Sequence, residues 1–119
     1  MLNDASDFAD IYIACGYTDL RCGIDGLSAI VEQKYSLNPF KPNILFLFCG
    51  RRTDRIKGLL WEGDGFLLLY KRLENGKFQW PRTEEEVRSM TPQQFRWLME
   101  GLSVEPKKVV KKVCPKRSL

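Results

Sequence analysis

The segment NILFLFCGRRTDRIKGLLWEGDGFLLLYKRLENGKFQWP, residues 43–81, contains apolar runs that are separated by turn residues. Gly50 follows the first run, Gly63-Asp64-Gly65 follows the second, and Asn75-Gly76 follows the third. Asp-Gly and Asn-Gly favour positive φ, and loops this short join antiparallel neighbours. The segment therefore predicts a four-stranded antiparallel meander. Its first run, Ile44–Cys49, is apolar on both alternating faces and is expected to be central.

The turn at Gly63 and Asp64 predicts the register of the second hairpin. On one face the cross-strand pairs are then Trp61–Phe66, Leu59–Leu68, Lys57–Tyr70 and Arg55–Arg72. This face is apolar beside the turn and basic at the far end, where two like charges disfavour pairing unless an anion lies over them. The alternative is an ordinary solvated strand face. The opposite face is the favoured core, and it carries Ile56, Gly58, Leu60, Leu67, Leu69 and Lys71.

Ahead of the meander, a short β-like run at residues 11–15 is followed by a helical pattern. The helix has one apolar side, made of Ile24, Leu27, Ile30, Val31 and Tyr35. Thr18 and Asp19, or Asp25, are candidates to cap it, and capping is the favoured role of Asp25. Arg21 is expected either to pair with Asp19 or Asp25 or to join the basic face.

Two capping boxes follow the meander. Thr83 begins the first, Thr83-Glu84-Glu85-Glu86, and Thr91 begins the second, Thr91-Pro92-Gln93-Gln94. Trp97 lies off the apolar stripe of the second helix, at its edge or on a partner surface. The predicted fold class is therefore α+β: an antiparallel four- to five-stranded sheet, arranged as a meander, with one helix before it and two short helices after it.

Length and composition predict a single α+β domain over residues 1–104. Residues 105–119 form a basic tail with two prolines and few large apolar groups, and we expect this tail to be disordered. No run approaches the ~20 apolar residues of a membrane span, and the N-terminus is acidic where a signal peptide would be basic. We therefore expect a cytoplasmic protein without membrane contact, with its four scattered cysteines as free thiols.

The charged residues are unevenly distributed along the chain. Residues 1–40 carry two basic and six acidic side chains, whereas residues 41–82 carry nine and four. The tail carries six basic side chains and one acidic. This segregation is typical of a protein that binds a polyanion. The chain has no histidine, which removes the commonest general base and zinc ligand, and we predict no catalytic residues, no metal and no cofactor.

The chain resembles the small accessory protein of the TnpB type, encoded by the second open reading frame of bacterial insertion sequences of the sixty-six family. The resemblance covers roughly residues 10 to 103, with GYTDLRCGIDGL at 16–27, NPF at 38–40 and the segment 45–81 in the same order. It implies a role in transposition beside a separate transposase that carries the strand-transfer carboxylates. The matching motif positions are Asp19, Arg21, Asp25, Arg51, Arg52, Arg55, Lys57, Trp61, Asp64, Gly65, Lys71 and Arg72.

Two functions follow as hypotheses. The first is a non-catalytic protein that binds transposon or target DNA through the basic sheet face, with phosphate contacts from Arg21, Arg51, Arg52, Arg55, Lys57, Lys71 and Arg72. The second is an assembly factor that contacts the transposase without binding DNA, through Trp61, Phe66 and Trp97. A nuclease that holds Mg²⁺ with Asp19, Asp25, Asp54 and Asp64 is disfavoured, because these aspartates adjoin turns where local hydrogen bonding explains them.

Overall fold

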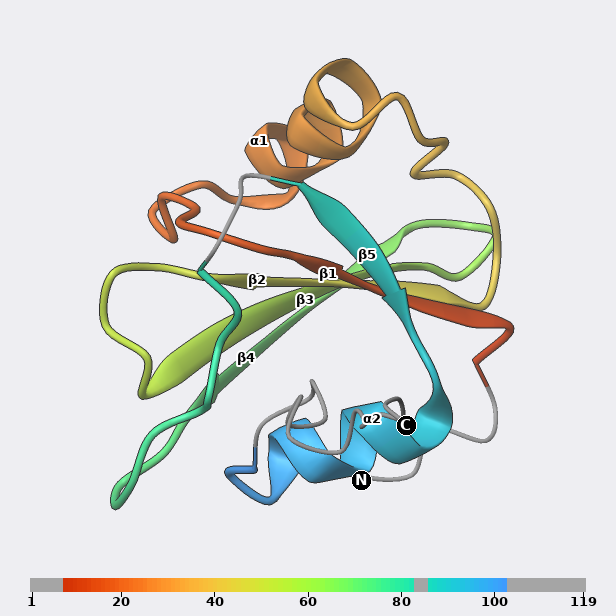
Figure 1. The fold of residues 1–119 in the computed structure, drawn as a ribbon. Coiled ribbons are helices and arrows are strands. Elements are labelled where there is room, and N and C mark those ends of the chain that lie inside the picture. Colours follow the sequence, from red (N-terminus) through yellow and green to blue (C-terminus); the bar gives the residue numbers. More distant parts are fainter. Residues whose placement is uncertain (1–7, 83–85, 103–119) are drawn as a thin grey trace, which may run out of the picture.

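The described part of the chain, residues 8–82 and 86–102 of the computed structural model, is built around a five-stranded sheet (Figure 1). In chain order the strands are β1 (Asp10–Ala14), β2 (Ile44–Cys49), β3 (Arg55–Trp61), β4 (Phe66–Arg72) and β5 (Val87–Met90). They lie in the order β4-β3-β2-β1-β5, so β4 and β5 are the two edges. The α+β class and the central position of β2 agree with the sequence-based expectation.

The turn chemistry of the meander positions β2, β3 and β4 as predicted. β2 pairs antiparallel with β3, and β3 pairs antiparallel with β4. In the second hairpin Trp61 lies opposite Phe66 and Arg55 lies opposite Arg72, so the predicted register is confirmed. Gly63 has a φ of 94°, a conformation that glycine adopts without steric cost, which explains why the turn falls there.

β1 makes the sheet mixed rather than antiparallel. It pairs parallel with β2, with Ile11 opposite Leu45 and Ile13 opposite Leu47, and antiparallel with β5. The prediction of a purely antiparallel sheet is therefore wrong at this position. A parallel pair requires a long crossover, and the helical segment between β1 and β2 supplies it.

The fourth strand predicted after Asn75-Gly76 is absent from the described residues, because residues 77–82 cross a face of the sheet instead of extending it. Phe78 and Trp80 are buried there. The Phe78 N–H donates to the Thr53 carbonyl at 2.7 Å, and the indole Nε1–H of Trp80 donates to the Ala14 carbonyl at 2.9 Å. Burial of two large rings against the sheet thus replaces the predicted strand pairing.

β5 occupies the place of a predicted helix. Val87–Met90 pairs with the edge of β1, whereas residues 83–85, which hold most of the first predicted capping box, lie outside the described residues. The Cys15 N–H extends the pairing by donating to the Glu86 carbonyl at 2.7 Å. Pairing with β1 satisfies backbone groups that a short helix would leave to water, and such tertiary contacts override local helix propensity.

The helix predicted before the meander is present as α1 (Ile24–Ala29), which continues into a π-helical turn, η1 (Ile30–Lys34). Its predicted apolar side faces the sheet, since Leu27 and Val31 are fully buried. The cap differs from the prediction: Gly23 is the N-cap and makes no side-chain hydrogen bond, and Asp25 lies in the first turn. A carboxylate in the first turn is favoured by the helix dipole, so Asp25 has a helical role other than the predicted one.

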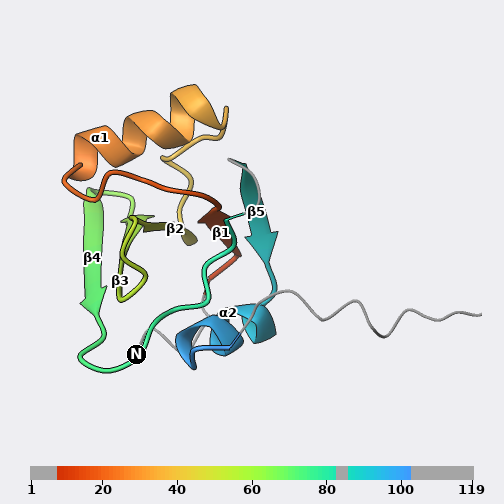
Figure 2. The same ribbon diagram turned by 60° about the vertical axis from the view of Figure 1, so that its left-hand side comes forward.

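Both faces of the sheet are covered, as Figure 2 shows with α1 and α2 (Pro92–Met99) on opposite sides. The α1 side buries Leu27, Val31, Phe46, Phe48 and Leu59. The α2 side buries Ile13, Leu47, Ile56, Phe78 and Phe95. In the described part of the chain, most of the sheet is therefore covered on both faces. The end of the α1 side where Arg55 and Lys57 lie is less covered, because both side chains are only partly buried.

The predicted core face of the hairpin is buried in the middle and open at the edge. Ile56 and Gly58 are buried, and Leu60 and Leu69 pack against the same cluster. Leu67 is 38% exposed, because β4 is an edge strand. Within the described residues, no disulfide joins Cys15, Cys22 and Cys49, which agrees with the prediction. Cys114 and the basic tail lie outside the described residues. In the described ranges, no helix combines the length and apolar character that a membrane span requires.

The second predicted capping box is confirmed at the start of α2. The Thr91 side chain accepts a hydrogen bond from the Gln94 N–H at 3.0 Å, and the Gln94 side chain accepts one from the Thr91 N–H at 2.9 Å. Pro92 occupies the first helical position, where its missing N–H costs nothing. The box starts the helix that carries Phe95 and Leu98 onto the sheet.

Replacing Thr91 with Ala is expected to lower the free energy of unfolding by about 1 kcal/mol, because the Gln94 N–H loses its acceptor. Thermal unfolding followed by circular dichroism should show a melting temperature lower by roughly 4–8 °C. The matched control is Thr91→Ser, which keeps the hydroxyl and should melt close to the parent protein. Equal destabilisation by both substitutions would contradict this role of the hydroxyl.

Candidate nucleic-acid interface

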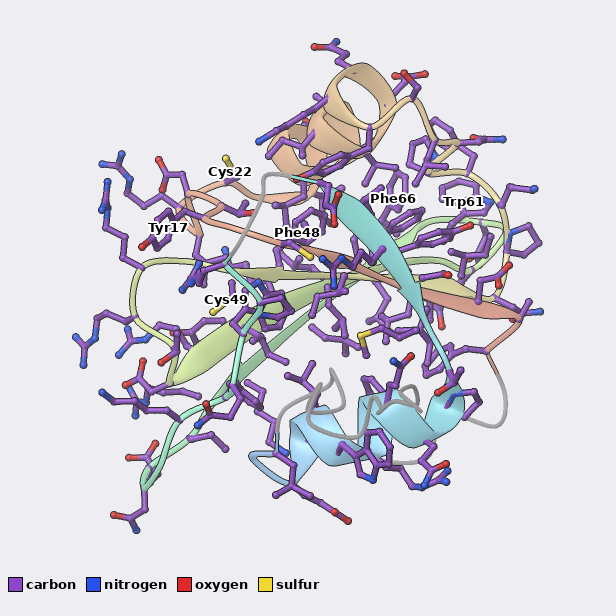
Figure 3. All side chains as sticks on the ribbon, viewed as in Figure 1. Tyr17, Cys22, Phe48, Cys49, Trp61 and Phe66 are labelled. Atoms are coloured by element: carbon purple, nitrogen blue, oxygen red, sulfur yellow. The ribbon has the colours of Figure 1, made fainter. Side chains whose placement is uncertain are left out.

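A basic hollow of about 1000 Å³ lies at the uncovered end of the α1 side of the sheet. Five basic side chains and one carboxylate line it, together with two tyrosines. The lining residues are Tyr17, Thr18, Asp19, Leu20, Arg21, Gly50, Arg51, Arg52, Arg55, Lys57, Leu68 and Tyr70. Figure 3 shows Tyr17 and Cys22 at this end of the sheet, and Trp61 and Phe66 at the other. We call this feature the basic hollow.

Three segments that are distant in the sequence form the walls of the basic hollow. Residues 17–21 follow β1, residues 50–52 follow β2, and the third wall is the far end of the β3–β4 hairpin. Since β1 and β2 are parallel and adjacent, the loops that follow them meet at one edge of the sheet. The backbone joins these two loops, as the Thr18 N–H donates to the Cys49 carbonyl at 2.9 Å.

Arg21 is held on the rim of the hollow by Asp19. The two side chains form a bidentate pair, with Nη2 2.8 Å from Oδ2 and Nε 3.0 Å from Oδ1, and the Arg21 N–H also donates to Oδ1 at 3.0 Å. These hydrogen bonds lower the pKa of Asp19 to about 2. Of the two partners that the sequence suggested, Asp19 is the one used, and the guanidinium remains 91% exposed.

Asp54 anchors two arginines at the opposite rim. Its carboxylate accepts from Arg55 Nε at 3.0 Å and lies 3.4 Å from Arg52 Nη2. The hydrogen bond from Arg55 is the main reason that the pKa of Asp54 is lowered. Arg55 is largely covered by its neighbours, whereas Arg52 is mostly exposed. Asp54 thus orients Arg55 and leaves Arg52 open to a ligand.

Lys57 and Tyr70 lie opposite each other on the floor of the hollow, as the register predicts. The Lys57 ammonium donates to the Cys22 carbonyl at 3.0 Å, which ties β3 to the loop before α1. An ammonium group has three N–H donors, so this bond leaves others for a ligand. Tyr70 is 54% exposed and presents its ring on the surface.

Arg82 is a structural residue of this site that the sequence did not reveal. Its guanidinium donates to the carbonyl oxygens of Gly16 and Gly50, and its Cζ lies 4.1 Å from the centre of the Tyr17 ring. Arg51 also lies over this ring, at 5.0 Å. Arg82 therefore joins the loops after β1 and β2 and positions Tyr17. No local pattern could have indicated it, because its partners lie 66 and 32 residues away in the sequence.

Cys49 lies next to the Arg82 side chain but is not suited to nucleophilic chemistry. Burial raises the pKa of its thiol to about 11, although the charge of Arg82 opposes the shift. The sulfur lies 3.5 Å from the Arg55 carbonyl and 3.6 Å from the Arg52 carbonyl, in positions to donate weak hydrogen bonds. A thiol that stays protonated near neutral pH is a poor nucleophile and a poor metal ligand.

Two predicted DNA-binding residues lie outside the basic hollow. Lys71 points to the α2 side of the sheet, opposite Ile56, because successive side chains of a strand alternate between faces. Arg72 shares the face of the hollow but not its lining, and its Nε lies 3.0 Å from a Glu74 carboxylate oxygen. The structure therefore gathers five of the seven predicted residues, namely Arg21, Arg51, Arg52, Arg55 and Lys57.

The three residues predicted to contact a protein partner do not form one surface. Trp61 and Phe66 are in contact, with ring centroids 4.8 Å apart, and Phe40 packs on both at 5.1 and 5.2 Å. Trp97 belongs to α2, on the other side of the sheet. Phe40 is 48% exposed and was not among the residues predicted for this surface. We call Phe40, Trp61 and Phe66 the aromatic cluster.

The aspartates that were considered as Mg²⁺ ligands are separated in the fold. Asp19 and Asp54 each pair with arginine, and Asp64 lies in the β3–β4 turn at the opposite end of the hairpin. Among the described residues, no three His, Cys, Asp or Glu side chains are grouped so as to hold a metal ion. The chemistry that the hollow offers is the binding of anions by guanidinium and ammonium groups beside exposed aromatic rings.

Comparisons with known proteins match a region that includes all of the basic hollow. The profile of the family described as "IS66 Orf2 like protein" matches residues 9–109. Two uncharacterized proteins of Sinorhizobium fredii, y4hO and y4jC, are 38% and 36% identical over 92 residues, which are 77% of this chain and 79% and 78% of theirs. No solved structure gives a significant match. On this evidence the chain belongs to the IS66 Orf2-like family.

Proposed function

We propose that this protein is a non-catalytic accessory factor for DNA transposition that binds DNA phosphates in the basic hollow. Membership of the IS66 Orf2-like family implies an accessory role associated with transposition. DNA binding is the finer part of the proposal, and one observation carries it. Five cationic side chains from three segments converge on one concave surface that a single carboxylate shares.

The balance of charge in the hollow supports a polyanionic ligand. Asp19 offsets Arg21, and Asp54, just outside the lining, is shared between Arg52 and Arg55. These two carboxylates leave the set with an excess of three positive charges. The excess lies on a surface that no described element covers, where successive phosphates of a nucleic acid can replace counterions. Ordinary small anions would use only one or two of these groups at a time.

The chemistry of the side chains supports binding without strong sequence preference. Arg51 and Arg52 are exposed on a loop, and such long side chains contact phosphates more readily than they fit base edges. Tyr17 and Tyr70 present rings that can pack against sugars or bases of any sequence.

Duplex DNA is expected to bind weakly, with an affinity that depends steeply on salt. If four to six phosphates are contacted, the slope of log K against log salt is about −4 to −5. Fluorescence anisotropy with labelled duplexes of unrelated sequence, titrated at several salt concentrations, measures both properties. A flat salt dependence, or no binding at low salt, would contradict the proposal.

Replacing Arg21, Arg51 and Arg52 with Gln is expected to leave the fold intact and to reduce the salt slope by about 2 to 3. These three arginines are the exposed ones of the hollow, so their loss costs little packing apart from the contact of Arg51 with the Tyr17 ring. Affinity should fall by a similar factor for every duplex tested. Circular dichroism verifies folding, and the anisotropy titration gives the slope.

The matched control replaces Lys71, Lys77 and Arg96 with Gln. This variant loses the same net charge from positions that do not line the hollow. Its affinity and salt slope should stay near those of the parent protein. If both variants lose affinity equally, general charge rather than the hollow is responsible, and the assignment of the site is wrong.

DNA affinity is expected to be constant between about pH 5.5 and 8. The chain has no histidine, and the hydrogen bonds from Arg21 lower the pKa of Asp19 to about 2. A carboxyl with a lowered pKa keeps its charge, and its contribution to the Arg21 pair, until the pH falls towards that value. Anisotropy titrations at constant ionic strength test this. A several-fold change within the range would indicate a titrating group that the hollow does not contain.

A second function, direct contact with the transposase, is supported by the aromatic cluster. Phe40 is half exposed beside Trp61 and Phe66, and exposed aromatic groups are common at protein interfaces. A purified transposase of the same element should then bind the parent protein but not a Phe40→Ala variant. The Arg21, Arg51 and Arg52 variant serves as the matched control, because transposase binding should survive in it. The opposite pattern would assign transposase contact to the hollow.

A further inference from the structure

β4 is an edge strand with unusually regular geometry. It is seven residues long, contains neither Gly nor Pro, and pairs one to one with β3 from Arg55–Arg72 to Trp61–Phe66, without a bulge. Figure 2 shows it as the outermost strand on its side, and no described element lies beyond it. Bulges, prolines, shortness and charged side chains are the usual devices that keep an edge from pairing with another chain. Of these, β4 has only the charged side chains, Lys71 and Arg72, at its C-terminal end.

The hydrogen bonds at the two ends of the hairpin show which backbone groups of β4 are free. The Leu73 N–H donates to the Asp54 carbonyl at 2.6 Å, and the Glu62 N–H donates to the Gly65 carbonyl at 2.9 Å. Bonded and non-bonded pairs alternate along an antiparallel ladder. The outward N–H and C=O groups of β4 therefore belong to Phe66, Leu68, Tyr70 and Arg72. Within the described part of the chain, these backbone groups have no hydrogen-bond partner.

The side chains of this edge are also more apolar than a solvated edge requires. Leu67 and Tyr70 are both exposed, one on each face of the strand. The only charged side chains of β4 are Lys71 and Arg72, both at its C-terminal end. The N-terminal and middle parts of the edge thus combine free backbone groups with apolar side chains, which is the composition of a strand-pairing interface.

We propose that two copies of the chain associate through β4, paired antiparallel about a two-fold axis at Leu69. In this register Phe66 lies opposite the partner's Arg72, and Leu68 lies opposite the partner's Tyr70. All four outward-facing residues of each strand then form bonded pairs. The two sheets become one sheet of ten strands.

The distribution of charge along β4 favours an antiparallel second copy as the occupant. The axis at Leu69 sets Lys71 opposite the partner's Leu67 and Arg72 opposite the partner's Phe66. No two like charges face each other, and each aliphatic stem covers an apolar side chain that is exposed in the single chain. A parallel in-register pairing would instead place Arg72 opposite the partner's Arg72. The strand is thus complementary to itself in one orientation, as a two-fold interface requires.

The pairing also has a geometric result for the basic hollow. A two-fold axis perpendicular to the sheet keeps the α1 sides of both copies on the same face. Tyr70 lines the hollow and lies next to the axis, so the two hollows come to adjoin across the paired β4 strands. The dimer does not depend on DNA binding, and it is tested without DNA.

Sedimentation equilibrium over a range of protein concentrations tests the dimer. The parent protein is expected to dimerise, and Leu67→Lys to raise the dimer dissociation constant about tenfold or more, because the introduced ammonium would face the partner's Lys71 twice per dimer. Adding Lys71→Glu to this variant places opposite charges face to face and should restore the dimer. The matched control is Leu102→Lys, which changes another exposed leucine away from β4 and should remain dimeric.

Amide hydrogen exchange supplies a second measurement that follows the alternation along the strand. In the parent dimer the amides of Leu68 and Tyr70 should exchange at least about tenfold more slowly than in Leu67→Lys, whereas those of Leu69 and Lys71 should be protected in both proteins. The proposal is overturned if the parent protein stays monomeric at its highest soluble concentration. It is equally overturned if a dimer forms while the Leu68 and Tyr70 amides remain unprotected.

Discussion

Burial of β2 on both faces is the constraint from which the rest of the architecture follows. All six of its residues, Ile44–Cys49, are buried, so the sheet needs a covering layer on each side. α1 and η1 supply one layer, and α2 with residues 77–82 supplies the other. The strand also needs two neighbours, and β1 and β3 provide them. A helix on only one face would leave half of β2 in contact with water.

The parts of the fold that could be predicted are those in which short-range chemistry decides the outcome. The Gly63 turn specified seven cross-strand pairs, and the Thr91 box specified the start of α2. The errors lie where two distant segments compete for one edge or one face. Acidic residues typical of a helix start precede Val87–Met90, yet this segment pairs with the open edge of β1 as a strand. Phe78 and Trp80 have the alternating spacing of a strand, yet both rings pack on the same face of the sheet.

Most of the charged residues of the basic hollow could be predicted from the sequence. The loops and contacts that bring them together could not. Arg55, Lys57 and Tyr70 were placed together because hairpin register is a local property. The sequence offered Arg21 as a member of this face only as an alternative, and it could not place Arg51 there, because the parallel pairing of β1 with β2 is what brings their loops together. Arg82, which holds those loops, has no neighbour in the sequence that indicates its role. Lys71 was placed correctly on the opposite face of the hairpin, and its listing among the DNA-binding residues rested on its charge alone.

The hydrogen bonds from Arg82 to the Gly16 and Gly50 carbonyls affect the order in which the parts of the basic hollow form during folding. The two carbonyl partners of Arg82, Gly16 and Gly50, lie 66 and 32 residues before it, so the contact closes two large loops of chain at once. Closing long loops is slow relative to forming a hairpin, because chain entropy opposes it before any contact is gained. The hairpin of β3 and β4 can form early, while the loops around Tyr17 lack the Arg82 contacts until residue 82 has been synthesised. A nascent chain on the ribosome would therefore contain the charged residues of the hollow before those residues are held in their concave arrangement.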